Sequence, residues 1–225
     1  MKTAVVTGAG KGIGFATAKK FLENGWRVVG TYHGAPIPVQ SDNLVAIPLE
    51  LTSSQDIARA AEEIKKAAPI IDVLINNAGV LLDGNDNGIT MQKLRATFEV
   101  NVFGLIDLTE RLVPLMPAGS QIVNLDSGYG SLIDPIDDAT TSAYRISKAA
   151  LSMYTKVAAF HLKEKGITVS AMAPGWVKTD MGNSIASDTE KPDRTPEDAA
   201  NDIYNLVIAQ PESGCFWEFG KKREW

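Results

Sequence analysis

The sequence has almost none of the side chains that cross-link a chain or bind a structural metal. Cys215 is its single cysteine, and its two histidines, His33 and His161, lie far apart. A lone cysteine cannot form an internal disulfide, and no Cys/His cluster has the spacing of zinc ligands. We therefore expect no metal, a buried structural thiol at Cys215 rather than a reactive one, and a reducing, cytoplasmic compartment.

Two further absences exclude classes of partner. The lysines and arginines are scattered and the formal net charge is −5, so no basic stripe is available to follow a phosphate backbone. No apolar run approaches the roughly 20 residues that span a bilayer. The opening "MKTAVVTGAG" lacks the apolar core and cleavage site of a signal peptide. We expect neither nucleic acid nor membrane among the partners.

What the sequence does contain is a nearly continuous alternation of short apolar segments with segments of helical periodicity. This pattern predicts the α/β class, with one doubly wound Rossmann domain over residues 1–225, a parallel sheet and helices on both faces. The expected strands are Thr3–Thr7, Arg27–Thr31, Leu44–Pro48, Ile71–Asn76, Gln121–Asp126, Thr168–Ala173 and Cys215–Glu218. The expected helices are Gly12–Asn24, Ser54–Lys66, Met91–Val100 running on towards Met116, Ala143–Lys165 and Pro196–Ala209.

Local signals support several of these boundaries. Ser53 with Asp56 has the form of a capping box, and Thr195 followed by Pro196 and Asp198 places a cap, a first-turn proline and a first-turn acid in order. Three stretches are irregular, and loops of this length in a compact domain more often bind ligands than merely connect elements. They are Gly34–Asn43, Asp83–Gly88 and Gly182–Arg194. We expect the last of them, the polar segment 182–194, to be a substrate lid loop.

A glycine-rich loop follows the first expected strand. In "VVTGAGKGIG", glycines 8, 10, 12 and 14 span the turn and the start of the first helix. Glycines allow a tight turn there, and the free N–H groups and dipole of the helix start stabilise a pyrophosphate. A plain turn is the alternative, but the strand-loop-helix context favours dinucleotide binding.

The end of the second strand indicates which dinucleotide is bound. A carboxylate usually stands there and binds the ribose 2′-hydroxyl, but this sequence has Tyr32 and His33. Without that carboxylate a 2′-phosphate is not repelled, and Lys11 can pair with it. Lys11 could also be a solvated loop lysine. We predict NADP in preference to NAD.

A tyrosine and a lysine in "SAYRISKAAL" have the spacing of a catalytic pair. Tyr144 and Lys148 are four residues apart, so a helix places them on one face. A free tyrosine has a pKa of about 10, which a nearby positive charge is expected to lower. Ser127 follows the fifth strand, which brings it to the carboxyl edge of the sheet where ligands bind. On its own, Ser127 could equally be a turn serine.

Six motifs stand in one order along the chain: "TGAGKGIG" at 7–14, "NNAG" at 76–79, "NVFG" at 101–104, Ser127 after "IVNLD", "YRISK" at 144–148 and "PGWVKTD" at 174–180. In order and spacing they resemble the short-chain dehydrogenase/reductase family. Together with the C-terminal tail, they look most like its carbonyl-reductase branch. The resemblance implies a seven-stranded parallel sheet, in agreement with the pattern above.

The resemblance also implies the site residues. It assigns catalytic roles to Asn101, Ser127, Tyr144 and Lys148, with Asn101 holding a water of a proton relay; a helix kink or cap is the alternative for Asn101. The implied cofactor-binding residues are Gly8, Gly10, Lys11, Gly12, Ile13, Gly14, Tyr32, His33, Glu50, Leu51, Asn77, Ala78, Gly79, Tyr144, Lys148, Pro174, Gly175, Val177 and Thr179.

The implied activity is the NADPH-dependent reduction of a ketone or aldehyde to an alcohol, reversibly, with Tyr144 as general acid/base. The alternative is a catalytically silent NADP(H)-sensing protein of the same fold. One residue departs from the family, because Asp126 precedes Ser127 where a small residue is common. Its carboxylate could face the pocket, but a bond to the backbone turn is favoured. The interval from Ser127 to Tyr144 lacks the added helix of monomeric carbonyl reductases, which leaves a homodimer or homotetramer open.

Overall fold

A single eight-stranded sheet forms the centre of the computed structural model, which describes residues 1–136 and 138–225. The strand order is β3-β2-β1-β4-β5-β6-β7-β8, and every neighbouring pair is parallel except β7 with β8. The predicted α/β class is confirmed. The strands are β1 (Thr3–Val6), β2 (Arg27–Tyr32), β3 (Leu44–Pro48), β4 (Val73–Asn76), β5 (Gln121–Leu125), β6 (Thr168–Ala173), β7 (Phe216–Glu218) and β8 (Lys221–Arg223).

The eighth strand was not expected from the sequence. Phe219 and Gly220, with φ angles of 50° and 73°, form a two-residue turn that reverses the chain after β7. Two consecutive positive φ values suit a tight hairpin, so the last residues return antiparallel along β7. The sheet therefore has one more strand than the seven predicted, and this strand lies at its C-terminal edge.

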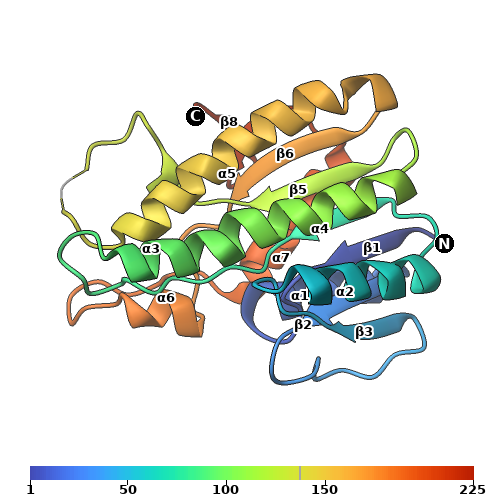
Figure 1. Ribbon diagram of the computed structural model, residues 1–225, viewed down its shortest axis with the longest axis horizontal. Helices are drawn as coiled ribbons and strands as arrows, with labels where there is room; N and C mark the ends of the chain where they lie inside the picture. Colours follow the sequence, from blue (N-terminus) through green and yellow to red (C-terminus); the bar gives the residue numbers. More distant parts are fainter. Residues whose placement is uncertain (137) are drawn as a thin grey trace.

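Helices cover both faces of the sheet (Figure 1). They are α1 (Gly12–Glu23), α2 (Ser54–Ala67), α3 (Met91–Phe98), α4 (Leu105–Leu112), α5 (Ser142–His161), α6 (Asp180–Ser184) and α7 (Pro196–Ala209). Ile64 of α2, Leu108 of α4 and Leu162 after α5 share one apolar core with one face of the strands. Phe21 of α1 and Ile203 of α7 lie in the core on the opposite face.

The expected long helix over residues 91–116 is interrupted. A π-helical segment, Glu99–Gly104, separates α3 from α4, and a 3₁₀ turn, Val113–Leu115, follows α4. Gly104 lies so close to the β3–α2 connection that an added Cβ would come 2.1 Å from the Leu51 carbonyl oxygen. Single π turns of this kind are often found at functional sites, and this one contains Asn101.

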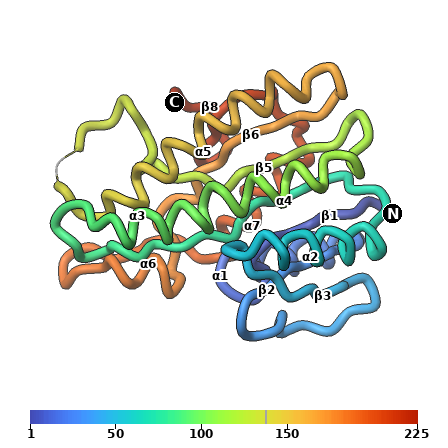
Figure 2. The backbone as a smooth tube through the Cα atoms, viewed as in Figure 1, coloured from blue at the N-terminus to red at the C-terminus, as the bar shows by residue number. Residues whose placement is uncertain are grey.

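The strand order places the carboxyl ends of the central strands at one edge. The chain crosses from β1 outward to β2 and β3, and then continues on the other side with β4, β5 and β6. Such a switch point is where α/β sheets bind ligands. Figure 2 shows the segments after β5 and β6, including α6, at the same end of the molecule.

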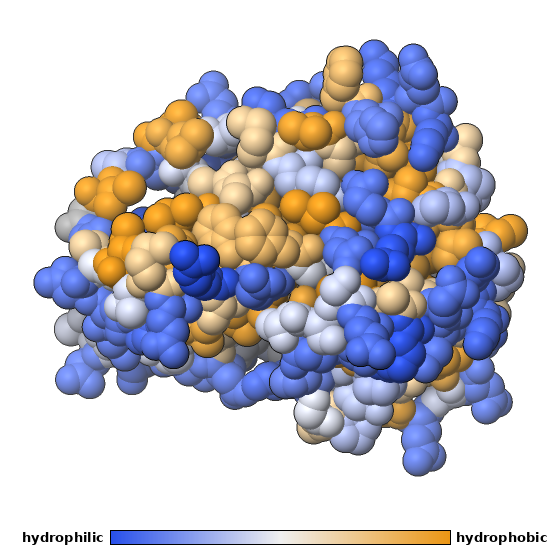
Figure 3. All heavy atoms as spheres, viewed as in Figure 1, coloured by the Kyte–Doolittle hydropathy of each residue, from blue (hydrophilic) through white to orange (hydrophobic). Residues whose placement is uncertain are grey.

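Apolar side chains are exposed on α5 and on the π-helical segment Glu99–Gly104, and Figure 3 shows apolar residues gathered on this side of the molecule. The most exposed is Phe160, at 85%. The others are Phe103, Ile146, Met153 and Val157. Within residues 1–136 and 138–225, no helix combines the length and apolarity that crossing a membrane requires.

The two helix starts expected from the sequence differ in how they are capped. At α7, Thr195 Oγ1 accepts the Asp198 N–H at 3.1 Å, and Asp198 Oδ2 accepts the Thr195 N–H at 2.9 Å, so the box is complete. At α2, Ser53 caps Asp56, but the Asp56 carboxylate accepts the Glu50 N–H instead of closing the box. The Asp56 carboxylate therefore binds the backbone of the preceding loop and not the N–H of Ser53.

We predict that Thr195→Ala lowers the free energy of unfolding by about 1 kcal/mol, because it removes the acceptor for an otherwise unpaired helix N–H. Thr90→Ala is the matched control, since Thr90 also precedes a helix but makes no side-chain cap bond. Its effect should stay below about 0.5 kcal/mol. Equal losses for the two variants in urea denaturation would contradict the importance of the box.

Candidate active site

The end of β5 and the start of α5 meet at the carboxyl edge of the sheet. Ser127 follows β5, and its Oγ accepts the Tyr129 N–H at 3.2 Å, which turns the chain into a short 3₁₀ segment, Gly128–Gly130. An added Cβ at Gly130 would lie 2.7 Å from the backbone carbon of Lys148. Only a residue without a side chain allows this approach, which sets Ser127 beside the α5 residues.

Tyr144 and Lys148 lie on one face of α5, as predicted. Tyr144 is half-buried and Lys148 is 6% exposed. The Lys148 ammonium is 5.5 Å from the centroid of the Tyr144 ring and donates to the Leu125 carbonyl oxygen at 2.6 Å. The structure therefore brings Ser127, Tyr144 and Lys148 together.

The expected lowering of the Tyr144 pKa is wrong. Burial raises the pKa of Tyr144 above its ordinary value, and the hydrogen bond with Ser127 opposes this only in part. Burial also lowers the pKa of the Lys148 ammonium, with Asp126 opposing that shift. Desolvation is the largest cause, and the nearby Asp126 carboxylate raises the pKa further, so Tyr144 is a protonated phenol at neutral pH.

Asn101 lies one layer further in and is 1% exposed. Its Oδ1 accepts the Val80 N–H at 2.8 Å, and its Nδ2 donates to the Val80 oxygen at 2.9 Å and to Ser147 Oγ at 3.1 Å. Ser147 in turn donates to the Tyr144 carbonyl oxygen at 2.7 Å. The side chain of Asn101 thus ties the segment after β4 to the turn of α5 that carries Tyr144, with both amide hydrogens used.

Asp83, which was not among the predicted site residues, holds the start of α5. It is 2% exposed, its Oδ2 accepts the Ala143 N–H at 2.5 Å and its backbone oxygen accepts the Thr141 N–H. An external carboxylate at a helix N-terminus satisfies a free N–H and suits the helix dipole. The sequence offered only an aspartate at the start of an irregular loop, 60 residues from its partner.

Asp126 is bonded to the backbone turn, as favoured from the sequence. Its Oδ1 accepts the Ser127 N–H at 2.9 Å, and its Oδ2 accepts the Ser152 hydroxyl at 2.7 Å. The side chain is 2% exposed. Burial raises the pKa of this carboxyl to about 6, against the lowering effects of Lys148 and the two hydrogen bonds.

The glycine loop packs against the end of β4. Asn77 Nδ2 donates to the Thr7 oxygen at 2.8 Å, and the Asn77 and Ala78 N–H groups both donate to Thr7 Oγ1 at 3.0 Å. Gly8 has a φ of 67°, and an added Cβ at Gly14 would lie 2.2 Å from the Gly8 oxygen. The glycines are therefore required for the loop to curl tightly over the start of α1.

The start of α1 fits a bound anion. Lys11 stands at the N-cap without a side-chain cap bond, and the first turn contains no acidic residue. The N–H groups of the helix start are thus not blocked by a capping side chain, and no carboxylate of the first turn competes with a phosphate. Thr179, from the segment after β6, lies opposite, since an added Cβ at Gly12 would be 3.2 Å from its methyl group. The predicted pyrophosphate residues are brought together.

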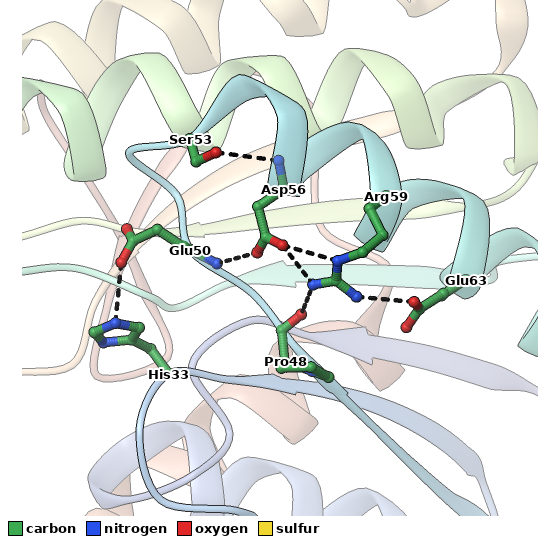
Figure 4. Close-up of polar contacts among 7 residues, drawn as sticks. All are labelled: His33, Pro48, Glu50, Ser53, Asp56, Arg59 and Glu63. Carbon is green, nitrogen blue, oxygen red and sulfur yellow. Dashed lines mark hydrogen bonds and ion pairs between the residues drawn. The ribbon is translucent and has the colours of Figure 1, made fainter.

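A lysine–aspartate ion pair and a histidine–glutamate contact occupy the side of the loop where a 2′-phosphate was expected. Lys11 Nζ pairs with Asp180 Oδ2 at 2.6 Å, with both side chains about four-fifths exposed. His33 Nε2 lies 3.0 Å from Glu50 Oε2, and the backbone of Glu50 is held in turn by Asp56 (Figure 4). Hydrogen bonds from Thr52 are the main cause of the lowered pKa of Glu50. Tyr32 stands next to Gly10, where an added Cβ would lie 3.4 Å from it.

The remaining predicted residues occupy different surroundings. Gly79 contacts the site, because an added Cβ would lie 3.3 Å from Asn101 Oδ1. Leu51 and Val177 are buried, at 8% and 3% exposure, and Ile13 packs partly against the core. The Pro174 oxygen accepts from Arg194, and Gly175, with a φ of 77°, fits between Arg194 and Phe219. Cys215 is buried, as expected.

The expected lid, residues 182–194, begins inside α6 and is anchored at its far end. Val177 and Arg194 form a parallel bridge, and an added Cβ at Gly84 would lie 2.8 Å from a methyl group of Ile185. The segment therefore rests on the loop that begins with Asp83. Through this loop it is connected to the start of α5.

Comparison with known proteins identifies the family. The profile of the family described as short chain dehydrogenase matches residues 2–190. The chain is 34% identical to Protein FixR of Bradyrhizobium diazoefficiens, over 91% of this chain and 80% of that protein. It is 32% identical to the short-chain dehydrogenase anuI of Penicillium roqueforti, over 79% of each. The chain therefore belongs to the short-chain dehydrogenase family, a class of NAD(P)-dependent oxidoreductases.

Solved structures agree with this membership. An NADPH-bound carbonyl reductase from chicken fatty liver superposes with a TM-score of 0.88 at 26% identity, over 100% of this chain and 94% of that one. A short-chain dehydrogenase from Burkholderia cenocepacia in complex with NADP gives a TM-score of 0.83 at 26% identity, over 96% and 95% of the two chains.

Because the carboxyl of Asp126 is buried, we expect the free energy of unfolding to depend on its protonation. Its pKa is about 6 in the fold and close to the ordinary 3.8 in the unfolded chain, so the carboxyl favours the fold below pH 4 and loses that advantage as pH rises through 6. Relative to the native protein, Asp126→Asn should therefore gain about 1–3 kcal/mol of unfolding free energy between pH 4 and pH 7.

Urea denaturation at several pH values measures this gain. The control is Asp188→Asn, which changes an exposed aspartate. A difference between native protein and Asp126→Asn that does not vary with pH would contradict the prediction.

Proposed function

We propose that this chain reduces a ketone or aldehyde to an alcohol with NADPH, and catalyses the reverse oxidation. The observation that carries this proposal is the meeting of Ser127 and Tyr144 beside the buried Lys148 ammonium at the carboxyl edge of the sheet. This is a hydroxyl pair suited to binding and protonating a carbonyl oxygen. The chicken carbonyl reductase, with the same fold and bound NADPH, supports the proposal.

The residues would divide the reaction as follows. A bound nicotinamide cofactor supplies the hydride. Ser127 donates a hydrogen bond to the carbonyl oxygen, and Tyr144, which is protonated at neutral pH, delivers the proton as negative charge develops there. The nearby Lys148 ammonium stabilises the tyrosinate that remains. In the oxidation direction, Tyr144 takes the proton back.

We infer that the cofactor lies across the glycine loop. The uncapped start of α1 would hold the pyrophosphate, with the segment from Pro174 to Thr179 on its other side. Lys11 would bind the 2′-phosphate after leaving Asp180, and the Glu50 carboxylate is already paired with His33. The neighbouring structures with NADP or NADPH support the preference for NADP over NAD.

Two further parts of the proposal concern the surroundings of the site. Segment 182–194 would act as a substrate lid, since it rests on the loop that holds the start of α5. The exposed apolar face of α5 would form the contact in a homodimer or homotetramer, because a helix face of this kind is normally covered. Sedimentation velocity of the native protein tests the assembly, and a monomer at micromolar concentration would contradict it.

A panel of ketones and aldehydes, assayed by the loss of NADPH absorbance, tests the reductase. Tyr144→Phe should lower kcat/KM by about 10²–10⁴-fold, because it removes only the proton donor. NADPH affinity, measured by calorimetry, should change less than about threefold, since the ring stays in place. Tight NADPH binding without turnover, with native protein and Tyr144→Phe alike, would favour the sensing protein instead.

A pair of variants tests the choice of cofactor. Lys11→Ala should weaken NADPH binding by about tenfold or more and leave NADH binding nearly unchanged, because only NADPH has the 2′-phosphate. Asp180→Asn is the matched control, as it frees Lys11 from its ion pair and should strengthen NADPH binding. Equal effects of Lys11→Ala on the two cofactors would remove the case for NADP.

A further inference from the structure

A carboxylate is buried directly behind the proposed catalytic serine. Asp126 is the residue after β5, and each of its two oxygens accepts one hydrogen bond, from the Ser127 N–H and from the Ser152 hydroxyl. Its side chain is 2% exposed. A carboxylate so placed has exchanged water for two fixed donors, and one of these belongs to the backbone of Ser127 itself.

The face of α5 that is turned towards this carboxylate carries three polar residues at intervals of about one turn: Tyr144, Lys148 and Ser152. Ser152 reaches Asp126, and Lys148 reaches the carbonyl oxygen of Leu125, the residue before Asp126. The carboxylate and the ammonium are therefore held by adjacent residues of one strand end and adjacent turns of one helix. Their mutual attraction acts on both groups.

Among residues 1–136 and 138–225, the titratable groups with an electrostatic effect on Asp126, Tyr144 or Lys148 are these three and Tyr129 from the turn after β5. Arg145 of α5 stacks on the Tyr129 ring at 4.2 Å. The C-terminal hairpin approaches through Arg223 and Glu218 near Gly128, and these two are paired with each other at 2.7 Å. Ser147 and Asn101, from α5 and the π-helical segment, are neutral.

An ammonium buried to this degree is costly unless it is paired. The Leu125 oxygen is a neutral dipole, whereas the ionised Asp126 carboxylate supplies an opposite charge that counteracts the effect of burial on Lys148. Burial alone favours the neutral amine, which would leave Tyr144 without an adjacent positive charge at the moment its proton leaves. The counter-charge opposes this loss.

We propose that Asp126 is a positioning residue for the reaction: its carboxylate keeps the Lys148 ammonium charged in the buried site and fixes Ser127 through the Ser127 N–H. This inference rests on the proposed reductase activity and adds a role that the family motif does not require. Its consequence is that carbonyl reduction persists to a higher pH than it would with a neutral residue at 126.

Asp126→Asn tests the proposal, because asparagine keeps the shape and can still accept the Ser127 N–H. With NADPH and benzaldehyde or cyclohexanone, kcat/KM should be within about threefold of native at pH 5.5 and at least about tenfold lower at pH 8. The alkaline midpoint of the profile should therefore move down by about one pH unit or more. Ser152→Ala keeps the charge and removes one hydrogen bond, so its midpoint should not move whatever its rate.

A second readout does not depend on turnover. In protein labelled with [ε-¹³C]lysine, the Lys148 resonance, assigned by its absence in Lys148→Ala, reports the charge on the amine. It should titrate about one pH unit or more lower in Asp126→Asn than in the native protein. If no carbonyl is reduced but this shift is present, the role of Asp126 stands and the proposed reductase fails.

The opposite result overturns the inference. If carbonyls are reduced and neither the rate profile nor the Lys148 resonance moves in Asp126→Asn, the carboxylate does not hold the charge. A uniform loss of rate at every pH with an unmoved resonance has the same meaning and reduces Asp126 to a structural role. Should Asp126→Asn fail to fold by circular dichroism, Asp126→Ser replaces it, with the same outcomes.

Discussion

The hydrogen bond from the Lys148 ammonium to the Leu125 carbonyl oxygen is the contact on which the site depends. At 2.6 Å it fixes the middle of α5 to the end of β5. The donor is a buried ammonium, whose charged form is disfavoured by desolvation. The distance between strand and helix at this point determines where Ser127 and Tyr144 stand. Asn101 and Asp83 then hold the turns of α5 on either side of Tyr144 in place.

The buried charges of Asp126 and Lys148 lie at this edge of the sheet, and their cost in stability is offset by apolar packing elsewhere. The two faces of the sheet are covered by apolar cores that contain most of the fully buried side chains. Asp126, by contrast, is held ionised at neutral pH at a cost in unfolding free energy. Sites that depart from the rules of a stable core in this way are expected where a protein does chemistry.

Much of the fold could be predicted because the spacing of apolar residues and the capping and turn residues at element ends are signals confined to a few neighbouring positions. The helix that carries Tyr144 and Lys148, and the glycine loop before α1, both follow from such short-range signals. The partners of Asp126, the bond from Asp83 to Ala143 and the pair of Lys11 with Asp180 join residues up to 169 positions apart. Only the packed sheet brings these together, and the balance between burial and charge at Tyr144 depends on that packing.

The close approach of Gly130 to α5 limits which substitutions the sequence can accept near the site. Any side chain at 130 would meet the backbone of Lys148 and Ala149 within 2.8 Å, so the turn would have to leave the helix. The position is closed to mutation as long as the site is kept. Tyr129 beside it is 42% exposed, so its side chain can be replaced without bringing a new atom against the backbone of α5. Of these two neighbouring residues, Gly130 cannot be substituted without moving the turn, whereas the side chain of Tyr129 can change.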